Sequence, residues 1–314
     1  MPENSFSLPS FAKINLGLRV IGKRSDDYHD IITIFQTVTL QDTIIFEPSN
    51  KIEMTCSDPS LPCDYRNIVV RAAQKLRAHS FARRLPFNGE IIEDPQSLPG
   101  AKMHLEKRIP SPGGLGGGSS NAAVVFIGLS RLWNIEMEPR TPAGVGAILG
   151  SDVPFFFTGG TAIGTGRGTD ITPIDDFRSE NVLIVAPDIA VSTAEAYDAL
   201  NAPSLTTDEA NRILGVCRSE AESVDSYLET ASNDFENTVF AAHPEIGKVK
   251  QRLLELGASK AFMSGSGASV FGIFDTKETR QAAQKALDNE VNWRKFAVAT
   301  ISRDEYREAL GITF

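Results

Sequence analysis

The sequence predicts an α+β fold in two domains, and three observations support this prediction. Apolar and polar residues alternate along residues 12–21, which is typical of a strand with one polar face. A glycine-rich stretch at residues 110–123 lies between an expected strand and an expected helix. From residue 181 the pattern changes to that of a sheet covered by helices on one face. We therefore expect domains at residues 1–178 and 179–314.

Length and composition limit the classes of protein to consider. A chain of 314 residues with 41% hydrophobic and 23% charged residues can bury a large core. It has no apolar run near the roughly 20 residues of a membrane-spanning helix, and no signal-like segment opens it, so we expect a cytoplasmic protein that binds no membrane. The net charge of −9 disfavours nucleic acid. Three cysteines without metal-ligand spacing predict neither structural zinc nor a disulfide framework.

The strand expected at residues 12–21 carries Lys13 and Asn15 together on its polar face. Residues 17–23 have the glycine and lysine spacing of a Walker A loop. Because Arg24 stands where Ser or Thr is required, and because the residues in between are strand-like, we exclude a P-loop.

Tyr28 and His29 follow a polar turn at residues 22–27 and precede strands expected at 31–40 and 43–47. A lone histidine is more often a surface or structural residue than a functional one. Next to an exposed tyrosine, however, it offers a flat, hydrogen-bonding surface for a ring.

The next region is less regular. Asn67 is expected to cap a helix. Residues 78–100 predict a surface excursion with one short strand at 89–93, because prolines, glycines and charges are mixed there. A strand at 102–109 then ends with two basic residues, the first of them Lys107. These two residues can simply be the solvent-exposed end of the strand, or they can neutralise an anion bound nearby.

The glycine-rich stretch at 110–123 contains five glycines and leads into a helix expected at 119–133. Main-chain N–H groups without side chains beside them can approach an anion. The first turn of a helix adds unpaired N–H groups and the positive end of its dipole. A flexible surface loop is the alternative, but the bounding prolines and the expected helix cap at 119–121 favour a loop that binds a nucleotide polyphosphate.

Asp152 follows a helix expected at 141–149 and is the one carboxylate in the stretch 150–157. An aspartate after a helix is commonly a turn former or a cap. Its apolar surroundings also allow a catalytic carboxylate, in combination with Lys13 and the glycine loop. A glycine pair at 159–160 predicts a hairpin turn into a further strand.

In the second half we expect strands at 182–186, 260–263, 269–274 and 296–302, and helices from residue 192 and at 208–216, 233–241, 245–256 and 276–287. Residues 263–269 form a second loop of small residues between two strands. A hairpin would account for this loop alone. Beside the first loop, it can form the second wall of one phosphate site.

Three stretches together resemble the three motifs of the GHMP kinases, the family of galactokinase, homoserine kinase, mevalonate kinase and phosphomevalonate kinase. They are Ala-Lys-Ile-Asn-Leu at 12–16, the glycine-rich stretch at 110–123 and the loop at 263–269. Further agreement comes from Asp-Tyr-His at 27–29, Lys-Arg-Ile-Pro at 107–110 and Gly-Ser-Asp-Val-Pro at 150–154. These stretches span almost the whole chain in the order found in the family.

The resemblance implies the two-domain GHMP kinase fold, with an N-terminal domain like the second domain of ribosomal protein S5 and a C-terminal ferredoxin-like domain. It also implies that ATP, with Mg²⁺, phosphorylates the 2-hydroxyl of the methylerythritol part of a cytidine-diphosphate substrate, in non-mevalonate isoprenoid precursor synthesis. We expect ATP itself to hold the magnesium ion, with Ser120 as a further contact. We expect a monomer or a weak dimer.

The resemblance also assigns roles to residues. Asp152 would be the base and Lys13 the neighbouring cation. The ATP phosphates would lie on Pro110, Ser111, Pro112, Gly113, Gly114, Leu115, Gly116, Gly117, Gly118, Ser119 and Ser120, with a second phosphate-side loop at Ser264, Gly265, Ser266 and Gly267. The acceptor substrate would contact Asn15, Tyr28, His29, Lys107, Thr193 and Tyr197, with its cytosine between the rings of Tyr28 and Tyr197.

Two alternatives stay open. One is another small-molecule kinase of the family, of the homoserine or mevalonate type. The aromatic rings of Tyr28 and Tyr197 disfavour it, because an aliphatic alcohol needs no paired rings. The other is a sensor that binds a nucleotide without turnover, which the presence of both Lys13 and Asp152 disfavours.

Overall fold

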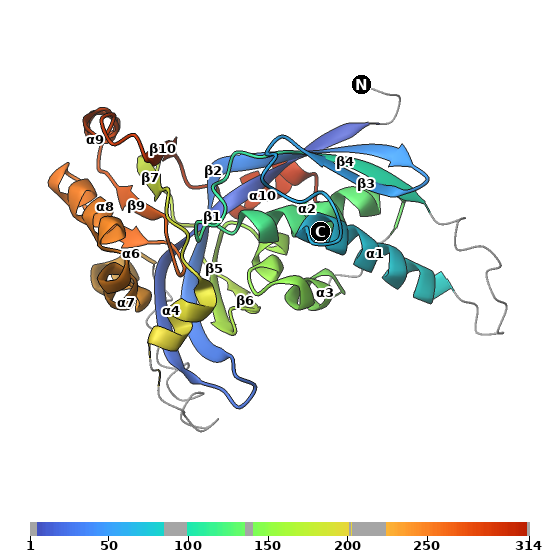
Figure 1. Ribbon diagram of the computed structural model, residues 1–314, viewed down its shortest axis with the longest axis horizontal. Helices are drawn as coiled ribbons and strands as arrows, with labels where there is room; N and C mark the ends of the chain where they lie inside the picture. The colour runs from blue at the N-terminus through green and yellow to red at the C-terminus, as the bar shows by residue number, and fades with distance from the viewer. Residues whose placement is uncertain (1–4, 85–98, 136–140, 201, 203–223, 313–314) are drawn as a thin grey trace.

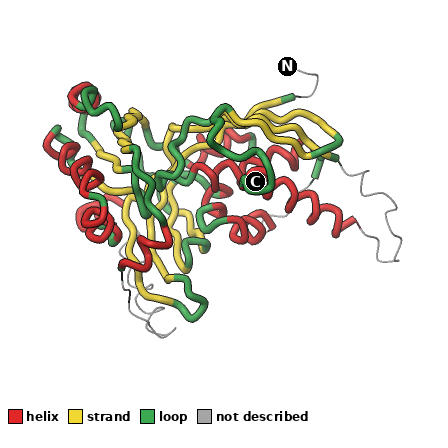
Figure 2. The backbone as a smooth tube through the Cα atoms, in the orientation of Figure 1, coloured by secondary structure: helices red, strands yellow, loops and turns green. Residues whose placement is uncertain are grey.

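The structure, a computed structural model, describes residues 5–84, 99–135, 141–200, 202 and 224–312. It contains two sheets (Figure 1). Figure 2 shows the strands running between two groups of helices. Within the described ranges, no helix is both long enough and apolar enough to cross a membrane.

The first sheet is built by the N-terminal part of the chain. Its strands are β1 (Phe6–Lys23), β2 (His29–Ser49), β3 (Ile52–Cys56), β4 (Gly100–Glu106), β5 (Thr161–Gly166) and β6 (Asp170–Pro173). Their order is β3-β4-β2-β5-β6, with β1 paired to β2. Among these described strands only β3 and β4 are parallel to each other. The helices of this half are α1 (Ile68–Arg84), α2 (Gly117–Leu132), α3 (Thr141–Leu149) and the 3-10 helix η2 (Val153–Phe157).

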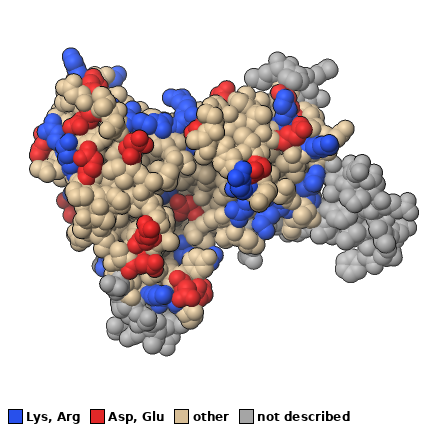
Figure 3. Space-filling view, in the orientation of Figure 1, with Lys and Arg blue, Asp and Glu red and all other residues tan. Residues whose placement is uncertain are grey.

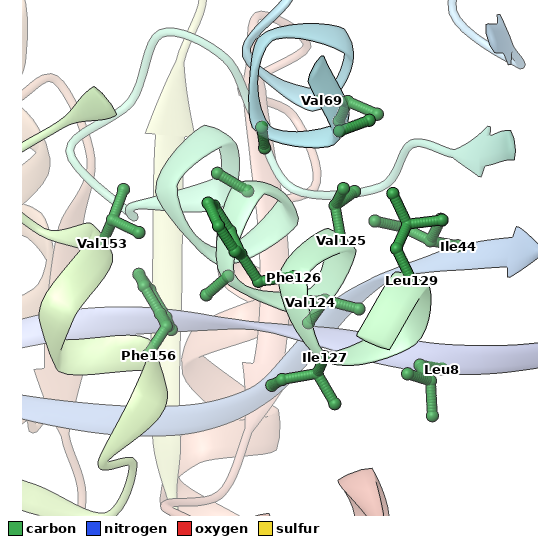
Figure 4. Close-up of a cluster of buried hydrophobic side chains, with 14 of the residues drawn as sticks. Leu8, Ile44, Val69, Val124, Val125, Phe126, Ile127, Leu129, Val153 and Phe156 are labelled. Carbon is green, nitrogen blue, oxygen red and sulfur yellow. The ribbon is translucent and has the colours of Figure 1, made fainter. Parts of the chain in front are cut away.

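Helix α2 lies at the centre of the first core because it is apolar on nearly all sides. Val124, Val125 and Phe126 are buried side chains on successive positions of this helix. Figure 4 shows them between side chains of the sheet, of α1 and of η2. The N-terminus of α2, where the glycine-rich stretch ends, is therefore anchored in the core.

The second sheet consists of β7 (Val182–Pro187), β8 (Lys260–Met263), β9 (Val270–Ile273) and β10 (Trp293–Val298). Its order is β10-β7-β9-β8, and its pairs are antiparallel. Helices α4 (Thr193–Ala199), α6 (Val224–Thr230), α7 (Phe235–Ala242) and α8 (Pro244–Glu255) lie between β7 and β8 in the chain, and α9 (Lys277–Ala286) lies between β9 and β10. Strand order and connections are those of the βαββαβ unit, which confirms the expected ferredoxin-like domain.

Helix α10 (Arg303–Leu310) was not predicted from the sequence. It packs on the first core, where Tyr306 is fully buried and its hydroxyl donates a hydrogen bond of 2.6 Å to the carbonyl oxygen of Phe156. Ser302 and Glu305 form a capping box at its start, which is a signal that the sequence does contain. The boundary expected at residue 178 falls between β6 and β7. Helix α10 follows this boundary in the chain but packs on the core of the N-terminal part.

Several expected boundaries were wrong. A single strand, β2, replaces the two strands expected at 31–40 and 43–47. Residues 78–84 continue helix α1 instead of starting the excursion. The start of α1 is as expected, since the Asn67 side chain accepts a hydrogen bond of 3.0 Å from the N–H of Val69. The strand expected at 89–93 and the helix expected at 208–216 lie outside the described residues.

Two turns also differ from the prediction. Helix α2 begins at Gly117, so the serines and the asparagine at 119–121 lie inside it instead of capping it. The residue before the helix, Gly116, has a φ of 68° and makes no side-chain cap. The glycine pair at 159–160 follows the 3-10 helix η2, so it is no hairpin turn, although the strand after it, β5, forms as expected.

Candidate active site

A pocket of about 220 Å³ lies where the glycine-rich stretch meets the second sheet. Figure 3 shows the molecule hollowed between the part that carries α1–α3 and the part that carries α7–α9. Of the site residues expected from the sequence, the pocket is lined by Lys13, Asn15, Pro112, Gly113, Gly114, Gly116, Asp152, Thr193, Tyr197, Gly265, Ser266 and Gly267. Its lining does not include Tyr28, His29, Lys107, Pro110, Ser111, Leu115, Gly117, Gly118, Ser119, Ser120 and Ser264.

Lys13 is the centre of this pocket. Its Nζ donates to Oδ1 of Asn15 at 2.6 Å and to the carbonyl oxygen of Gly114 at 2.8 Å. It also lies 3.4 Å from Oδ2 of Asp152. The Lys13 side chain is 3% exposed and that of Asp152 is 30% exposed, so the carboxylate is the more accessible member of the pair.

The polar face of β1 is buried, which differs from the half-exposed strand that alternation predicts. The reason is that the glycine-rich stretch lies across this face, and the N–H of Lys13 donates to the carbonyl oxygen of Leu115 at 3.0 Å. Gly116 has a positive φ, and a Cβ placed there would lie 3.0 Å from Cγ of Lys13 and from Cζ of Phe156. Only glycine lets the stretch lie this close to the lysine.

The second small-residue loop packs directly on the first. The Ser264 hydroxyl donates to the carbonyl oxygen of Gly114 at 2.9 Å, and the N–H of Ser269 donates to that of Gly113 at 3.2 Å. Asn233, which the sequence did not identify, holds this loop through its side-chain amide. Its Nδ2 donates to the carbonyl oxygens of Met263 at 2.7 Å and Gly265 at 2.8 Å. Residues of the two loops therefore line one pocket, and the binding of phosphate between them stays a prediction.

The aromatic residues group differently from the expected pair. The ring of Tyr197 stacks on His29 with centroids 4.8 Å apart, and it is nearly perpendicular to the ring of Phe235, also with centroids 4.8 Å apart. Tyr28 is 52% exposed, and the guanidinium of Arg167 lies 4.2 Å from the centre of its ring. Burial, and to a smaller degree the Asp152 charge, raises the pKa of Tyr197 to about 12, so its hydroxyl stays protonated at neutral pH.

His29 and Thr193 connect these rings to the rest of the site. Burial lowers the pKa of His29, and the charge of Lys23 adds to this effect, so the neutral imidazole is the form that stacks on Tyr197. The Thr193 hydroxyl lies 2.9 Å from that of Ser266. This contact ties helix α4, which carries Tyr197, to the second small-residue loop.

Lys107 lies next to Gly117, the first residue of α2, and does not line the pocket. Its Nζ is 2.9 Å from Oδ2 of Asp42, and both side chains are buried. Asp42 also accepts from the N–H groups of Arg108 at 2.7 Å and Ile109 at 2.8 Å, and from Nδ2 of Asn121 at 3.1 Å. Burial lowers the pKa of Lys107, and the Asp42 charge opposes this shift. Asp42 was not identified in the sequence, yet it anchors the approach to the glycine-rich stretch.

We expect Asp42→Asn to lower the free energy of unfolding by about 3 kcal/mol, because it leaves the buried Lys107 ammonium without its counter-charge. Urea unfolding followed by circular dichroism measures this loss. The matched control is Asp64→Asn, which removes a carboxylate from the exposed pair with Arg66 and should change stability little. Equal stability of the two variants would contradict the anchoring role of Asp42.

The pocket fits a magnesium ion that arrives with phosphate ligands. Asp152 is its one lining carboxylate, and no group of three or more His, Cys, Asp or Glu in the described chain could hold a metal ion. Mg²⁺ is commonly bound by one or two carboxylates together with substrate phosphates and water. Ser120 lies deeper, fully buried, and its hydroxyl accepts a hydrogen bond of 2.8 Å from that of Ser10.

Two family regions match the chain. Residues 67–160 match the GHMP kinases N terminal domain, and residues 215–292 match the GHMP kinases C terminal region. Together they cover more than half of the chain, and they include the glycine-rich stretch, Asp152 and the second small-residue loop.

Proteins of similar sequence align with this chain over nearly its full length. The 4-diphosphocytidyl-2-C-methyl-D-erythritol kinase of Solibacter usitatus is 38% identical and aligns with 96% of this chain and 90% of its own. The 4-diphosphocytidyl-2-C-methyl-D-erythritol kinase of Syntrophotalea carbinolica is 37% identical and aligns with 95% of this chain and 99% of its own. A crystal structure of 4-(cytidine 5'-diphospho)-2C-methyl-D-erythritol kinase has a TM-score of 0.71 at 29% identity, covering 94% of this chain and 99% of that one.

A homoserine kinase from Cytophaga hutchinsonii shares the fold, with a TM-score of 0.64 at 19% identity and 96% of both chains covered. The chain therefore belongs to the GHMP kinase family of ATP-dependent kinases, together with the 4-diphosphocytidyl-2-C-methyl-D-erythritol kinases that it resembles in sequence.

Proposed function

We propose that this kinase transfers the γ-phosphoryl group of ATP to the 2-hydroxyl of 4-diphosphocytidyl-2-C-methyl-D-erythritol, giving the 2-phosphate and ADP. The observation that carries the proposal is the Lys13–Asp152 pair, 3.4 Å apart, in a pocket walled by two glycine loops. The names of the relatives support the choice of acceptor. The same proposal includes a cytoplasmic location and a monomeric or weakly dimeric state.

Each group in the pocket has a task in this reaction. Asp152 accepts the proton of the acceptor's 2-hydroxyl. The oxygen of this hydroxyl forms the new bond to the γ-phosphorus, and the bond between the γ-phosphorus and the bridging oxygen breaks, so that ADP leaves. Lys13 offsets negative charge on the transferring group, and the N–H groups of the two loops hold the phosphates. A magnesium ion bound with ATP would neutralise further charge on its phosphates.

The acceptor side of the pocket is assigned by its chemistry. Asn15 and Thr193 can hydrogen-bond the methylerythritol hydroxyls, since both line the pocket. The rings of Tyr28, His29 and Tyr197 supply the flat surfaces that a cytosine needs. Lys107, which is buried on Asp42, is assigned to support of the glycine-rich stretch instead of to the acceptor.

A coupled assay for ADP release tests the proposal with three alcohols: the cytidine-diphosphate substrate, mevalonate and homoserine. We expect magnesium-dependent turnover with the first and very little with the other two, because neither aliphatic alcohol can use the aromatic surfaces. Equal activity with homoserine would reject the assignment. Binding of ATP without turnover of any of the three would favour the sensor.

A further inference from the structure

We infer that Arg167 binds the diphosphate of the acceptor substrate and thereby selects an alcohol carried on a nucleoside diphosphate. This inference rests on the proposed function. Arg167 lines the same pocket as Lys13 and Asp152, and its guanidinium lies over the ring of Tyr28. No role for this arginine was expected from the sequence.

The first argument is charge. Lys13 and Arg167 are the two cationic side chains that line the pocket in the described part of the chain. Lys13 is already engaged by Asn15, Gly114 and Asp152, at the place of phosphoryl transfer. A protein with a net charge of −9 has to hold an acceptor diphosphate with local cations. Arg167 is the cation left for this task.

The second argument is the availability of the guanidinium. Within the described chain, no carboxylate forms an ion pair with Arg167, although Asp170 begins strand β6 directly after the turn. Its contact is with the face of Tyr28, which leaves the N–H groups at the edge of the guanidinium for other acceptors. A guanidinium can donate two parallel hydrogen bonds to phosphate oxygens, which an ammonium cannot.

The third argument is the order of groups along the site. Arg167 is in contact with Tyr28 at one end and lines the pocket that holds Asp152 at the other. The acceptor has the same order of parts: a base, a diphosphate and then the reacting alcohol. A cytosine near the aromatic rings and a hydroxyl at Asp152 would leave the diphosphate between them, beside the guanidinium.

The backbone that carries Arg167 is held in place by its turn. Strands β5 and β6 pair up to Thr165 and Asp170, and the N–H of Gly168 donates to the carbonyl oxygen of Thr165 at 3.0 Å. The two neighbours of Arg167, Gly166 and Gly168, have φ values of 63° and 85°. The turn fixes the backbone of Arg167 beside the pocket, so binding a phosphate requires a movement of the side chain alone.

Calorimetric titration of the full-length protein with CDP and with cytidine tests the inference. Arg167→Gln should weaken CDP binding about 10- to 100-fold, the range for hydrogen bonds to charged groups, and leave cytidine binding within about twofold. Arg167→Lys should recover part of the loss, because it restores the charge without the two-pronged geometry. The matched control is Arg178→Gln, an arginine outside this pocket, for which CDP affinity should not change.

Two results would overturn the inference. Equal losses for CDP and cytidine would mean that Arg167 acts on the base through Tyr28, and unchanged CDP affinity would mean that it does not contact the diphosphate. A parallel steady-state assay should show a raised KM for the cytidine-diphosphate substrate and a KM for ATP within about twofold of wild type. Failure of the proposed function would appear instead in the wild-type protein, as absence of turnover.

Discussion

Asp152→Asn is expected to lower kcat by about 100- to 10,000-fold, the range for loss of a positioned general base. The amide has the shape of the carboxylate but cannot take the proton from the acceptor hydroxyl. The fold of the pocket should persist, because Lys13 still donates to Asn15 and Gly114 in the variant. The KM for ATP should therefore stay within about threefold of wild type.

Single-turnover measurement of ADP formation at saturating ATP gives the rate of the chemical step. The matched control is Asp175→Asn, which removes an exposed carboxylate that does not line the pocket and should leave the rate unchanged. Wild-type turnover in Asp152→Asn would remove Asp152 as the base. The Lys13–Asp152 pair would then be a structural ion pair, and another proton acceptor would be required.

Gly114→Ala should have the largest effect among changes that leave the polar groups in place. Gly114 has a φ of 72°, and a Cβ there would overlap with the carbonyl oxygen of Ser264 in the facing loop. Left-handed backbone strain costs about 1–3 kcal/mol for a residue with a side chain. Overpacking adds about 1–3 kcal/mol. The carbonyl oxygen of Gly114 also accepts from Lys13, so the loop cannot shift without moving the lysine.

We therefore expect Gly114→Ala to lower both the free energy of unfolding and kcat, the latter by about 100-fold or more, since a misplacement of 1 Å can cost that much. Urea unfolding and the coupled assay measure the two effects. Gly144→Ala is the control, because an ideal Cβ at this helical glycine meets nothing within 4 Å and should stabilise α3 slightly. Wild-type stability and rate in Gly114→Ala would contradict the close packing of the two loops.

Most elements could be predicted from the sequence because their signals are local. Lys13 and Asn15 share one face because they are two positions apart in a strand. Asn67 and Thr276 were correctly placed at helix starts, because an N-cap satisfies N–H groups only two or three residues away. Strand β8 of the second sheet was predicted at its observed bounds from a short apolar run, but the last strand, expected at 296–302, forms earlier in the chain, as β10 at Trp293–Val298.

Errors arose where a residue acts through distant partners. Alternation in β1 predicted a half-buried strand with one polar face, but this face is buried because the glycine-rich stretch covers it. In the sequence Asp42 resembles a turn residue. Only the structure shows that it accepts hydrogen bonds from Arg108, Ile109 and Asn121. Helix α10 was missed because its apolar face is short, and its burial depends on a core formed by the other end of the chain.

The sequence by itself determined which chemical groups the protein possesses: two glycine loops, a lysine, a carboxylate and a set of aromatic rings, in the order found in one kinase family. The tertiary structure decided which of them meet. In the structure Asp152 lies beside Lys13, and Tyr197 stacks on His29. Lys107 is paired with Asp42 outside the pocket lining, whereas Arg167 is part of this lining. The physical reason is that propensity and periodicity act over a few residues, whereas a site is made by packing between segments far apart in the chain.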